Sequence, residues 1–254
     1  MATSSPPFSR RMAQLARKKK SRIIVALDPA PVKRNLKQFA IRTIDAVAGD
    51  CCAVKMNFHL LLPLSSREIA EVTKRAHSRQ LLCIADIKLN DIGDTNEVAL
   101  EHLARMGFDA VIANPFMGAN TLASLAKKAR ALGMGVIALV YMSHPDAGEG
   151  YGLQAHGDMM YRIFLDRAVK AKVDGIVVGA TQTDILSEIS EKKKELKVSS
   201  LAVYSPGVGA QGGDARQAVE SGSDYLIIGR SIVQTKDQAM AARWFRLLAA
   251  SPSP

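Results

Sequence analysis

Residues 81–107 read LLCIADIKLNDIGDTNEVALEHLARMG, and this stretch contains the pattern that decides the fold. Residues 81–87 form a short, mainly apolar run that is typical of a buried strand. Residues 95–106 then repeat apolar side chains with helical spacing, and Gly107 stands where a helix C-cap is expected. A buried strand followed directly by a helix is the repeating unit of parallel α/β folds.

Charged residues gather at the end of the predicted strand of this unit. Asp86, Lys88 and Asp91 fall within six residues. Side chains alternate along a strand, so Asp86 and Lys88 should point the same way, whereas Asp91 should lie on the following turn. Charges held near an apolar interior are usually paired with each other or functional. The pattern alone leaves open whether these residues form a structural ion pair or part of an active site.

The same alternation of strand and helix runs along the chain without an obvious linker. Helical spacing recurs at residues 65–78, 120–132 and 181–196, and residues 181–184 (TQTD) predict a helix start with a side-chain cap. Eight such units in 254 residues predict the α/β class and a single (β/α)8 TIM barrel. An open doubly wound sheet is the competing architecture, but no GxGxxG follows the first strand. The predicted strands span residues 23–27, 53–56, 81–87, 110–113, 135–141, 175–178, 201–204 and 225–228.

Much of the net charge of +10 comes from the N-terminus, where residues 1–22 hold seven basic residues and no acidic one. The rest of the chain is nearly balanced, which argues against a nucleic-acid-binding body. The N-terminal segment admits three interpretations: a solvated basic arm, a transit peptide or a helix. Because Phe8, Met12 and Leu15 share one helical face, we favour a helix that covers the barrel bottom. We therefore divide the chain into residues 1–22, the basic arm or helix, and residues 23–250, the catalytic barrel.

Cysteine, histidine and hydropathy patterns exclude several classes of protein. No apolar run approaches the ~18 residues of a membrane-spanning helix, so we expect a cytoplasmic protein. Cys51, Cys52 and Cys83 lie in or beside apolar segments without CxxC spacing, as buried thiols in a reducing compartment would. The five histidines show no HExxH spacing and have no cysteine partners, so we expect no metal site.

The carboxyl ends of the predicted strands carry polar residues, as the reactive residues of a TIM barrel do. Barrels often bind phosphate with the loops after strands seven and eight, where this chain has a glycine-rich loop and an arginine. Glycines let backbone N–H groups approach an anion, and arginine adds a fixed positive fork. A glycine-rich loop without special function is the alternative. The strand-end residues are Asp28, Lys55, Asp86, Lys88, Ser143, residues 205–214 and residues 229–231.

Together these motifs resemble the orotidine 5'-phosphate decarboxylase family in its compact archaeal and bacterial form. The resemblance covers about residues 22–232. The chain departs from the family in its long basic N-terminus, in Gly93 where relatives often have proline, and in the polar stretch 146–154. The matching residues are Asp86-x-Lys88-x-x-Asp91, Lys55, Asp28, MSHP at 142–145, PGVGAQGG at 206–213 and IGRS at 228–231.

The resemblance implies cofactor-independent decarboxylation of orotidine 5'-monophosphate to UMP in pyrimidine biosynthesis. Lys88 would stabilise and then protonate the carbanion at C6, and Asp86 would lie beside the departing carboxylate. Asp91 and Thr95 would complete the partner's site in a homodimer. The other implied substrate-binding residues are Asp28 and Lys55 for the ribose, Ser143 for the pyrimidine, and Pro206, Gln211, Gly229 and Arg230, the last three for the phosphate.

Two alternatives stay open. Mg²⁺-dependent sugar-phosphate decarboxylases and aldolases of the same barrel group share the Asp-x-Lys-x-x-Asp motif, but they generally carry an acidic metal ligand where this chain has Lys55, a cation that repels Mg²⁺. A non-catalytic barrel whose basic tail binds nucleic acid is the second alternative, against which the intact Asp86 and Lys88 argue. We expect orotidine 5'-monophosphate and UMP as ligands, and no metal, cofactor, membrane or nucleic acid.

Overall fold

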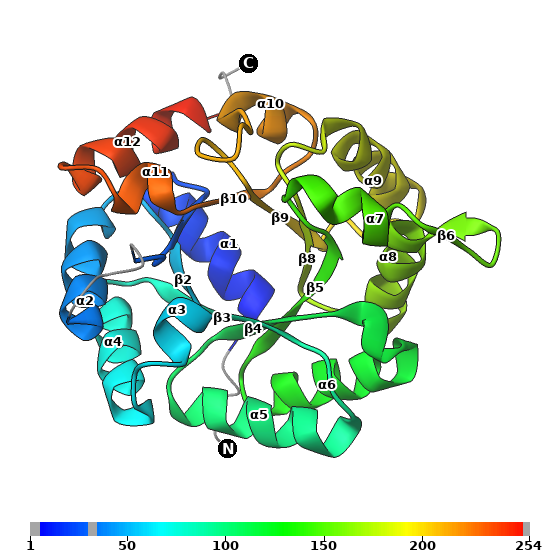
Figure 1. Ribbon diagram of the computed structural model, residues 1–254, viewed down its shortest axis with the longest axis horizontal. Helices are drawn as coiled ribbons and strands as arrows, with labels where there is room; N and C mark the ends of the chain where they lie inside the picture. The colour runs from blue at the N-terminus through cyan, green and yellow to red at the C-terminus, as the bar shows by residue number, and fades with distance from the viewer. Residues whose placement is uncertain (1–5, 30–34, 251–254) are drawn as a thin grey trace.

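Eight parallel strands close into a barrel with helices around it (Figure 1), as the sequence predicts. The computed structural model describes residues 6–29 and 35–250, so residues 1–5 of the predicted N-terminal segment lie outside it. Neighbouring strands follow the order β1-β10-β9-β8-β5-β4-β3-β2. The barrel strands are β1 (Ile23–Ala26), β2 (Ala53–Asn57), β3 (Leu82–Leu89), β4 (Ala110–Ala113), β5 (Gly135–Tyr141), β8 (Gly175–Val178), β9 (Ala202–Pro206) and β10 (Tyr225–Ile228).

Helices connect successive strands on the outside of the barrel, the arrangement that parallel strands require. None of the helices in the described ranges has the length and apolar character needed to cross a membrane. The main helices of this layer are α2 (Leu36–Val47), α4 (Ser66–Ser78), α5 (Gly93–Arg105), α6 (Ala119–Ala131), α8 (Met160–Ala171), α9 (Thr183–Glu195), α10 (Ala215–Glu220) and α12 (Gln238–Leu248).

Short elements shape the loops between the strands and the main helices. A hairpin of β6 and β7 projects from the barrel beside α8 (Figure 1), and it begins at the last residue of the polar stretch 146–154 that departs from the family pattern. The short elements are α3 (Phe58–Leu61), η1 (Pro115–Met117), η2 (Pro145–Ala147), α7 (Gly148–Tyr151), β6 (Gln154–Ala155), β7 (Asp158–Met159) and α11 (Arg230–Val233).

Strand side chains divide the core into two layers. Ile24 of β1 packs inside the barrel, whereas its neighbours Ile23 and Val25 pack between the barrel and the helices. This alternation is the two-residue period of a strand, and both layers are apolar because a parallel sheet is buried on both faces. Each fully buried aliphatic side chain contributes about 1.5–3 kcal/mol, so the barrel is a rigid frame for residues at its ends.

Helix α1 (Phe8–Lys19) covers the amino-terminal end of the barrel, which confirms the helix predicted there. Phe8 and Met12 are buried against the interior layer, and Leu15 packs at its edge. The first residue of β5 is Gly135, and a Cβ atom at this position would lie 2.6 Å from the Phe8 ring. Glycine is therefore required here so that the aromatic ring can enter the barrel mouth.

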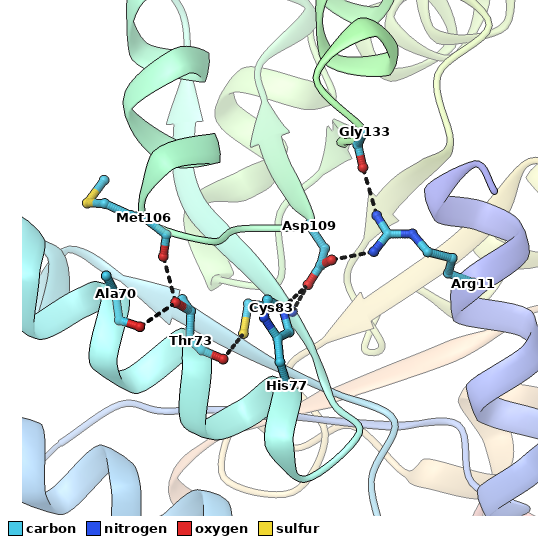
Figure 2. A network of polar contacts seen from close by, with 8 residues as sticks. All are labelled: Arg11, Ala70, Thr73, His77, Cys83, Met106, Asp109 and Gly133. Carbon is cyan, nitrogen blue, oxygen red and sulfur yellow. Dashed lines mark hydrogen bonds and ion pairs between the residues drawn. The ribbon is translucent and has the colours of Figure 1, made fainter. Parts of the chain in front are cut away.

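A polar network attaches α1 to the barrel (Figure 2). Asp109 precedes β4 and receives the Arg11 guanidinium of α1, while its other oxygen lies 2.9 Å from His77 Nε2 and accepts the Cys83 N–H at 2.8 Å. Arg11 also donates to the Gly133 carbonyl at 2.8 Å. Burial acts to raise the pKa of Asp109, but the hydrogen bonds from His77, Cys83 and Arg11 outweigh it and lower the pKa.

One local expectation needs correction. Residues 181–184 form no side-chain cap: α9 begins at Thr183 after Gln182, whose side chain instead donates to Thr181 Oγ1 at 3.5 Å.

The expectation that Asp86 and Lys88 point the same way is confirmed, since the Lys88 ammonium lies 2.8 Å from Asp86 Oδ1. The strand is nevertheless irregular at its end, where the register shifts between Ala85 and Leu89 and Lys88 has a φ of 48°. Lys88 therefore reaches its position through a strained backbone.

Candidate active site

A cavity of about 260 Å³ opens at the carboxyl end of the barrel strands. It brings together most of the residues that the sequence predicted for the site, from strands far apart along the chain. The predicted residues that line it are Asp28, Lys55, Asp86, Lys88, Ser143, Pro206, Gln211, Gly229 and Arg230.

Lys55, Asp86 and Lys88 form a line of alternating charge on one wall of the cavity. The Lys55 ammonium lies 2.6 Å from Asp86 Oδ2, and the Lys88 ammonium lies 2.8 Å from Asp86 Oδ1. Parallel pairing of β2 with β3 sets Asn57 opposite Asp86, which places Lys55 on the adjacent strand. Each oxygen of one carboxylate therefore receives a different lysine.

The two lysines differ in their access to a ligand. Lys55 is buried, with 7% of its side chain exposed, whereas Lys88 keeps 36% exposed. Burial acts to lower the pKa of Lys55, but the charges of Asp86 and Asp28 outweigh it and raise the pKa. Burial likewise acts to raise the pKa of Asp86, and Lys55 and Lys88 together lower it. Lys55 and Asp86 are thus held in their charged forms at neutral pH, and Lys88 faces the open space.

Asp28 carries the unsatisfied polar atom of the site. Its Oδ1 is buried and has no hydrogen-bond partner among the described residues. A Cβ atom at Gly229 would lie 2.9 Å from Asp28 Oδ2, so the close approach of β1 and β10 requires glycine at this position. A buried carboxylate oxygen without a donor is costly, and a ligand hydroxyl in the cavity would satisfy it.

The loops after β9 and β10 form the opposite side of the cavity. Gly207 has a φ of 97°, and a Cβ atom there would lie 2.9 Å from both Gln211 Oε1 and Ser143 Cβ. Arg230 follows β10, and its guanidinium makes no hydrogen bond or ion pair with the residues that the structure describes. This end of the cavity therefore offers a free, permanently charged fork and a nearby amide side chain, which suit a phosphate group.

The floor of the cavity is apolar. Four of its residues, Ile112, Leu139, Val177 and Ile227, lie on the interior face of their strands and were not predicted, although the two-residue alternation of each strand could have found them. Met142 and Val208 instead follow strands, within the MSHP and PGVGAQGG motifs. His144 also lines the cavity and stands within the MSHP motif, although only Ser143 was assigned a role. The apolar lining residues are Ile112, Leu139, Met142, Val177, Val208 and Ile227.

Asp91 and Thr95 do not line the cavity of their own chain. Both are exposed at the start of α5, beside the rim of the barrel. Asn96 fixes this turn, since its side chain donates to the Asp91 carbonyl at 2.6 Å and accepts the Asp91 N–H at 3.1 Å. The Asp91 carboxylate accepts only the adjacent Ile92 N–H, at 2.7 Å, among the described residues.

Comparisons with known proteins agree with this geometry. The family model described as "Orotidine 5'-phosphate decarboxylase / HUMPS family" matches residues 21–245. Orotidine 5'-phosphate decarboxylases of Methanococcoides burtonii and Methanosarcina barkeri are 31% and 32% identical over 89% of this chain, covering 95% and 93% of those proteins. The crystal structure of orotidine 5'-monophosphate decarboxylase from Methanocaldococcus jannaschii, complexed with the inhibitor BMP, superposes with a TM-score of 0.77 at 27% identity, covering 91% of this chain and 99% of that one.

Proposed function

The chain belongs to the orotidine 5'-phosphate decarboxylase / HUMPS family, and we propose that it converts orotidine 5'-monophosphate to UMP, in the cytoplasm and without a metal or cofactor. The observation that carries this proposal is the Lys55–Asp86–Lys88 line, with its exposed lysine facing a cavity whose far side offers Arg230. The three cysteines are free and buried, as expected of thiols in a reducing compartment.

Lys88 supplies the charge that the reaction needs. Loss of carbon dioxide from C6 leaves an electron pair in the plane of the pyrimidine ring, where resonance cannot spread it. An ammonium fixed by Asp86 at 2.8 Å is preorganised to stabilise that pair and then to protonate it. Asp86, held ionised, disfavours a second carboxylate beside it, so departure of the substrate carboxylate relieves that repulsion.

The other lining residues are assigned to the remaining parts of the nucleotide. Asp28, with its unsatisfied oxygen, and Lys55 bind the ribose hydroxyls. Ser143 contacts the pyrimidine edge, with Pro206 in the same wall. Gln211, Gly229 and Arg230 bind the phosphate, since Gln211 and Gly229 line the same cavity as the free Arg230 guanidinium.

Lys55 distinguishes this chain from the Mg²⁺-dependent enzymes that share the family model. A metal-binding relative needs carboxylate oxygens at the end of the second strand. Here that position holds an ammonium 2.6 Å from Asp86, which neutralises the carboxylate that would otherwise ligate a cation. The donor set therefore does not fit Mg²⁺.

A homodimer with shared active sites is the second part of the proposal. Loops after β2, β3 and β4 are neighbours in the barrel, and they expose large apolar side chains next to Asp91 and Thr95. Exposed apolar side chains grouped in this way are typical of a subunit interface. In a symmetric dimer, Asp91 and Thr95 reach the partner's cavity. The apolar side chains are Phe58, Leu62, Ile92, Val98 and Phe116.

The decisive experiment for the reaction follows the ultraviolet absorbance of orotidine 5'-monophosphate with purified protein and excess EDTA. We expect conversion to UMP at the same rate with and without the chelator. A requirement for added Mg²⁺, or no turnover of this nucleotide, would contradict the proposal.

Subunit mixing tests the shared site. Lys88→Ala and Asp91→Ala dimers should each be inactive, and exchange of subunits should restore part of the activity because one site of each mixed dimer contains neither change. Differently tagged subunits establish that exchange has occurred. Continued inactivity after proven exchange would contradict a site shared between subunits.

A further inference from the structure

A second cavity lies at the opposite end of the barrel from the active site. It has a volume of about 340 Å³ and is enclosed by the end of α1, the starts of β1 and β10, and the end of α12. Its polar lining consists mainly of Arg17, Lys20, Arg22 and Arg246, with Tyr225 and Asp224 beside them.

Most of the positive charge around this cavity has no counter-charge. Arg17 and Lys20 make no side-chain hydrogen bond or ion pair within residues 6–29 and 35–250. Arg22 reaches only the Ser223 carbonyl, at 3.5 Å. The Arg246 guanidinium, by contrast, is paired with Asp50 at 2.7 Å.

The acidic residue of the lining does not neutralise these three cations. The Asp224 carboxylate accepts the Val203 N–H at 2.8 Å and pairs with Lys193 at 3.2 Å, both outside the cavity lining. Like charges gathered at one hollow repel each other, and a concave surface of one sign attracts small ions of the other sign. An anion in the cavity would offset that repulsion.

Tyr225 adds a hydroxyl group to this wall. Burial raises the pKa of the Tyr225 phenol, with Cys52 and Asp224 adding to the rise, while the charges of Arg22 and Arg17 act to lower it. At neutral pH this phenol can therefore donate a hydrogen bond. The lining thus offers three unpaired cations and a hydroxyl donor against the single carboxylate of Asp224, both of whose partners bind through Oδ2.

We infer that this cavity binds the phosphate group of a small molecule. Guanidinium groups match phosphate oxygens in geometry and charge, and a hollow of this size admits a small molecule. Arg17 and Lys20 lie outside residues 21–245, which the family model matches, so membership of the family does not by itself imply this site. It is independent of the proposed decarboxylation.

Two other basic residues of the N-terminal segment, Arg11 and Lys19, have structural roles. Arg11 binds Asp109, and Lys19 donates to the carbonyls of Ala48 and Arg79 at 2.8 and 3.1 Å. Arg10 and Lys18 belong to the same segment but lie outside the cavity lining. Neutralising them therefore removes as much charge as neutralising Arg17 and Lys20, without changing the cavity.

Titration calorimetry of the full-length protein with inorganic pyrophosphate, in low salt without divalent cations, tests the inference. In an Arg230→Gln background, which weakens phosphate binding at the active site, one binding event should persist. Adding Arg17→Gln and Lys20→Gln should weaken that event by about 10- to 100-fold, since two charge-assisted contacts are lost. The matched Arg10→Gln and Lys18→Gln pair should change it less than about threefold.

A parallel titration with ribose 5-phosphate distinguishes a site for inorganic anions from a site for organic phosphates. Binding of either ligand supports the inference if it is weakened by the Arg17→Gln and Lys20→Gln pair and hardly changed by the Arg10→Gln and Lys18→Gln pair. Equal weakening by both pairs would show attraction to net charge alone and would overturn it. So would persistence of binding in the Arg17→Gln, Lys20→Gln protein. Tighter binding of a single-stranded oligonucleotide than of either phosphate, reduced equally by both pairs, would also overturn it in favour of a nucleic-acid surface.

Discussion

The two ends of the barrel each hold a buried aspartate between two basic side chains, yet they differ in what is left unsatisfied. At the carboxyl end, Asp86 binds Lys55 and Lys88, and Lys88 and Asp28 Oδ1 still face an open cavity. At the amino end, Asp109 receives Arg11, His77 and a backbone N–H beneath a helix that closes the barrel. Arg11 Nε also lacks a partner among the described residues, but it is buried and Arg11 lines neither cavity. A buried charge therefore signals catalysis only where its neighbours retain capacity for a ligand.

Lys88 and Asp109 differ in backbone geometry as well. Lys88 has a left-handed φ of 48° at the irregular end of β3, whereas Asp109 precedes a regular β4. Left-handed residues also occur at the amino end, where Lys20, Gln80, Lys172 and Lys197 follow the ends of helices. Lys88 differs from them because it lies inside a strand and lines the active-site cavity, the kind of place where backbone strain is often functional.

Removal of Lys88 should have the largest effect. Lys88→Ala takes away both the cation beside the developing carbanion and its proton donor, so kcat should fall by more than about 10⁴-fold. Circular dichroism should show an intact fold, because Lys88 is partly exposed. The matched change at the other end, Arg11→Ala, should leave kcat within about threefold at 25 °C, since that residue only anchors α1. A Lys88→Ala protein with a tenth of the wild-type kcat would remove Lys88 from the reaction.

The next effect concerns the phosphate. Arg230→Ala should lower kcat/KM for the nucleotide by about 10³-fold, or about 4 kcal/mol, because phosphate binding energy assembles the site. The slow reaction of the phosphate-free nucleoside should hardly change. Added phosphite should partly rescue that reaction in the wild-type protein and not in Arg230→Ala. Equal losses on nucleotide and nucleoside would instead assign Arg230 to the fold or to the ring site.

Gln211→Ala provides the graded control for this assignment. A neutral amide makes a hydrogen bond to phosphate that is roughly half as strong as a charged one, so the same pattern should appear more weakly. A larger loss of kcat/KM for Gln211→Ala than for Arg230→Ala would contradict the assignment of the Arg230 guanidinium to the phosphate.

The comparison of the two ends also explains what the sequence could predict. Apolar runs and helical spacing located all eight barrel strands and the covering helix, because burial dictates those patterns. Charged residues at the carboxyl ends of strands located the cavity wall, because a barrel brings those strand ends together. The unsatisfied Asp28 oxygen depends on side chains from distant strands, which local sequence does not encode.

The amino end was harder to predict for a physical reason. Asp109 directly precedes the apolar run of β4 and resembles any strand-start residue, and its partners Arg11 and His77 are 98 and 32 residues away. The irregularity that turns Lys88 toward the cavity was equally hidden, because regular alternation already predicted the correct side. Long-range pairs and local strain are fixed by the closed barrel, and so they appear only in three dimensions.

Phe8 tests whether α1 is part of the barrel core. The ring is 1% exposed and fills the space above Gly135, so Phe8→Ala should destabilise the protein by about 3 kcal/mol. Urea unfolding followed by circular dichroism measures this change, and kcat below the transition should be unaffected. The control is Met240→Ala on the outer helix α12, where the side chain is 67% exposed and a loss below about 1 kcal/mol is expected. Similar losses for the two variants would mean that α1 is a surface appendage.

The smallest expected effect lies in the pH dependence of Asp109. Its pKa in the folded protein is lowered, whereas an unfolded aspartate titrates near pH ~3.9. The stabilisation is therefore complete above the unfolded pKa and is lost as the pH falls through the folded pKa. Asp109→Asn should cost about 1–3 kcal/mol between pH 6 and 7, and this difference from the wild type should shrink below about pH 4.

Asp45→Asn is the control, because Asp45 also binds two arginines, Arg75 and Arg79, but on the outer surface between α2 and α4. Solvent screens that pair, so its loss should stay below about 1 kcal/mol. Neither variant should alter kcat at neutral pH, since both aspartates lie away from the cavity at the carboxyl end. A change in kcat for Asp109→Asn alone, at a pH where the protein is fully folded, would show that the amino end of the barrel affects the active site. It would contradict a purely structural role for the Asp109 network.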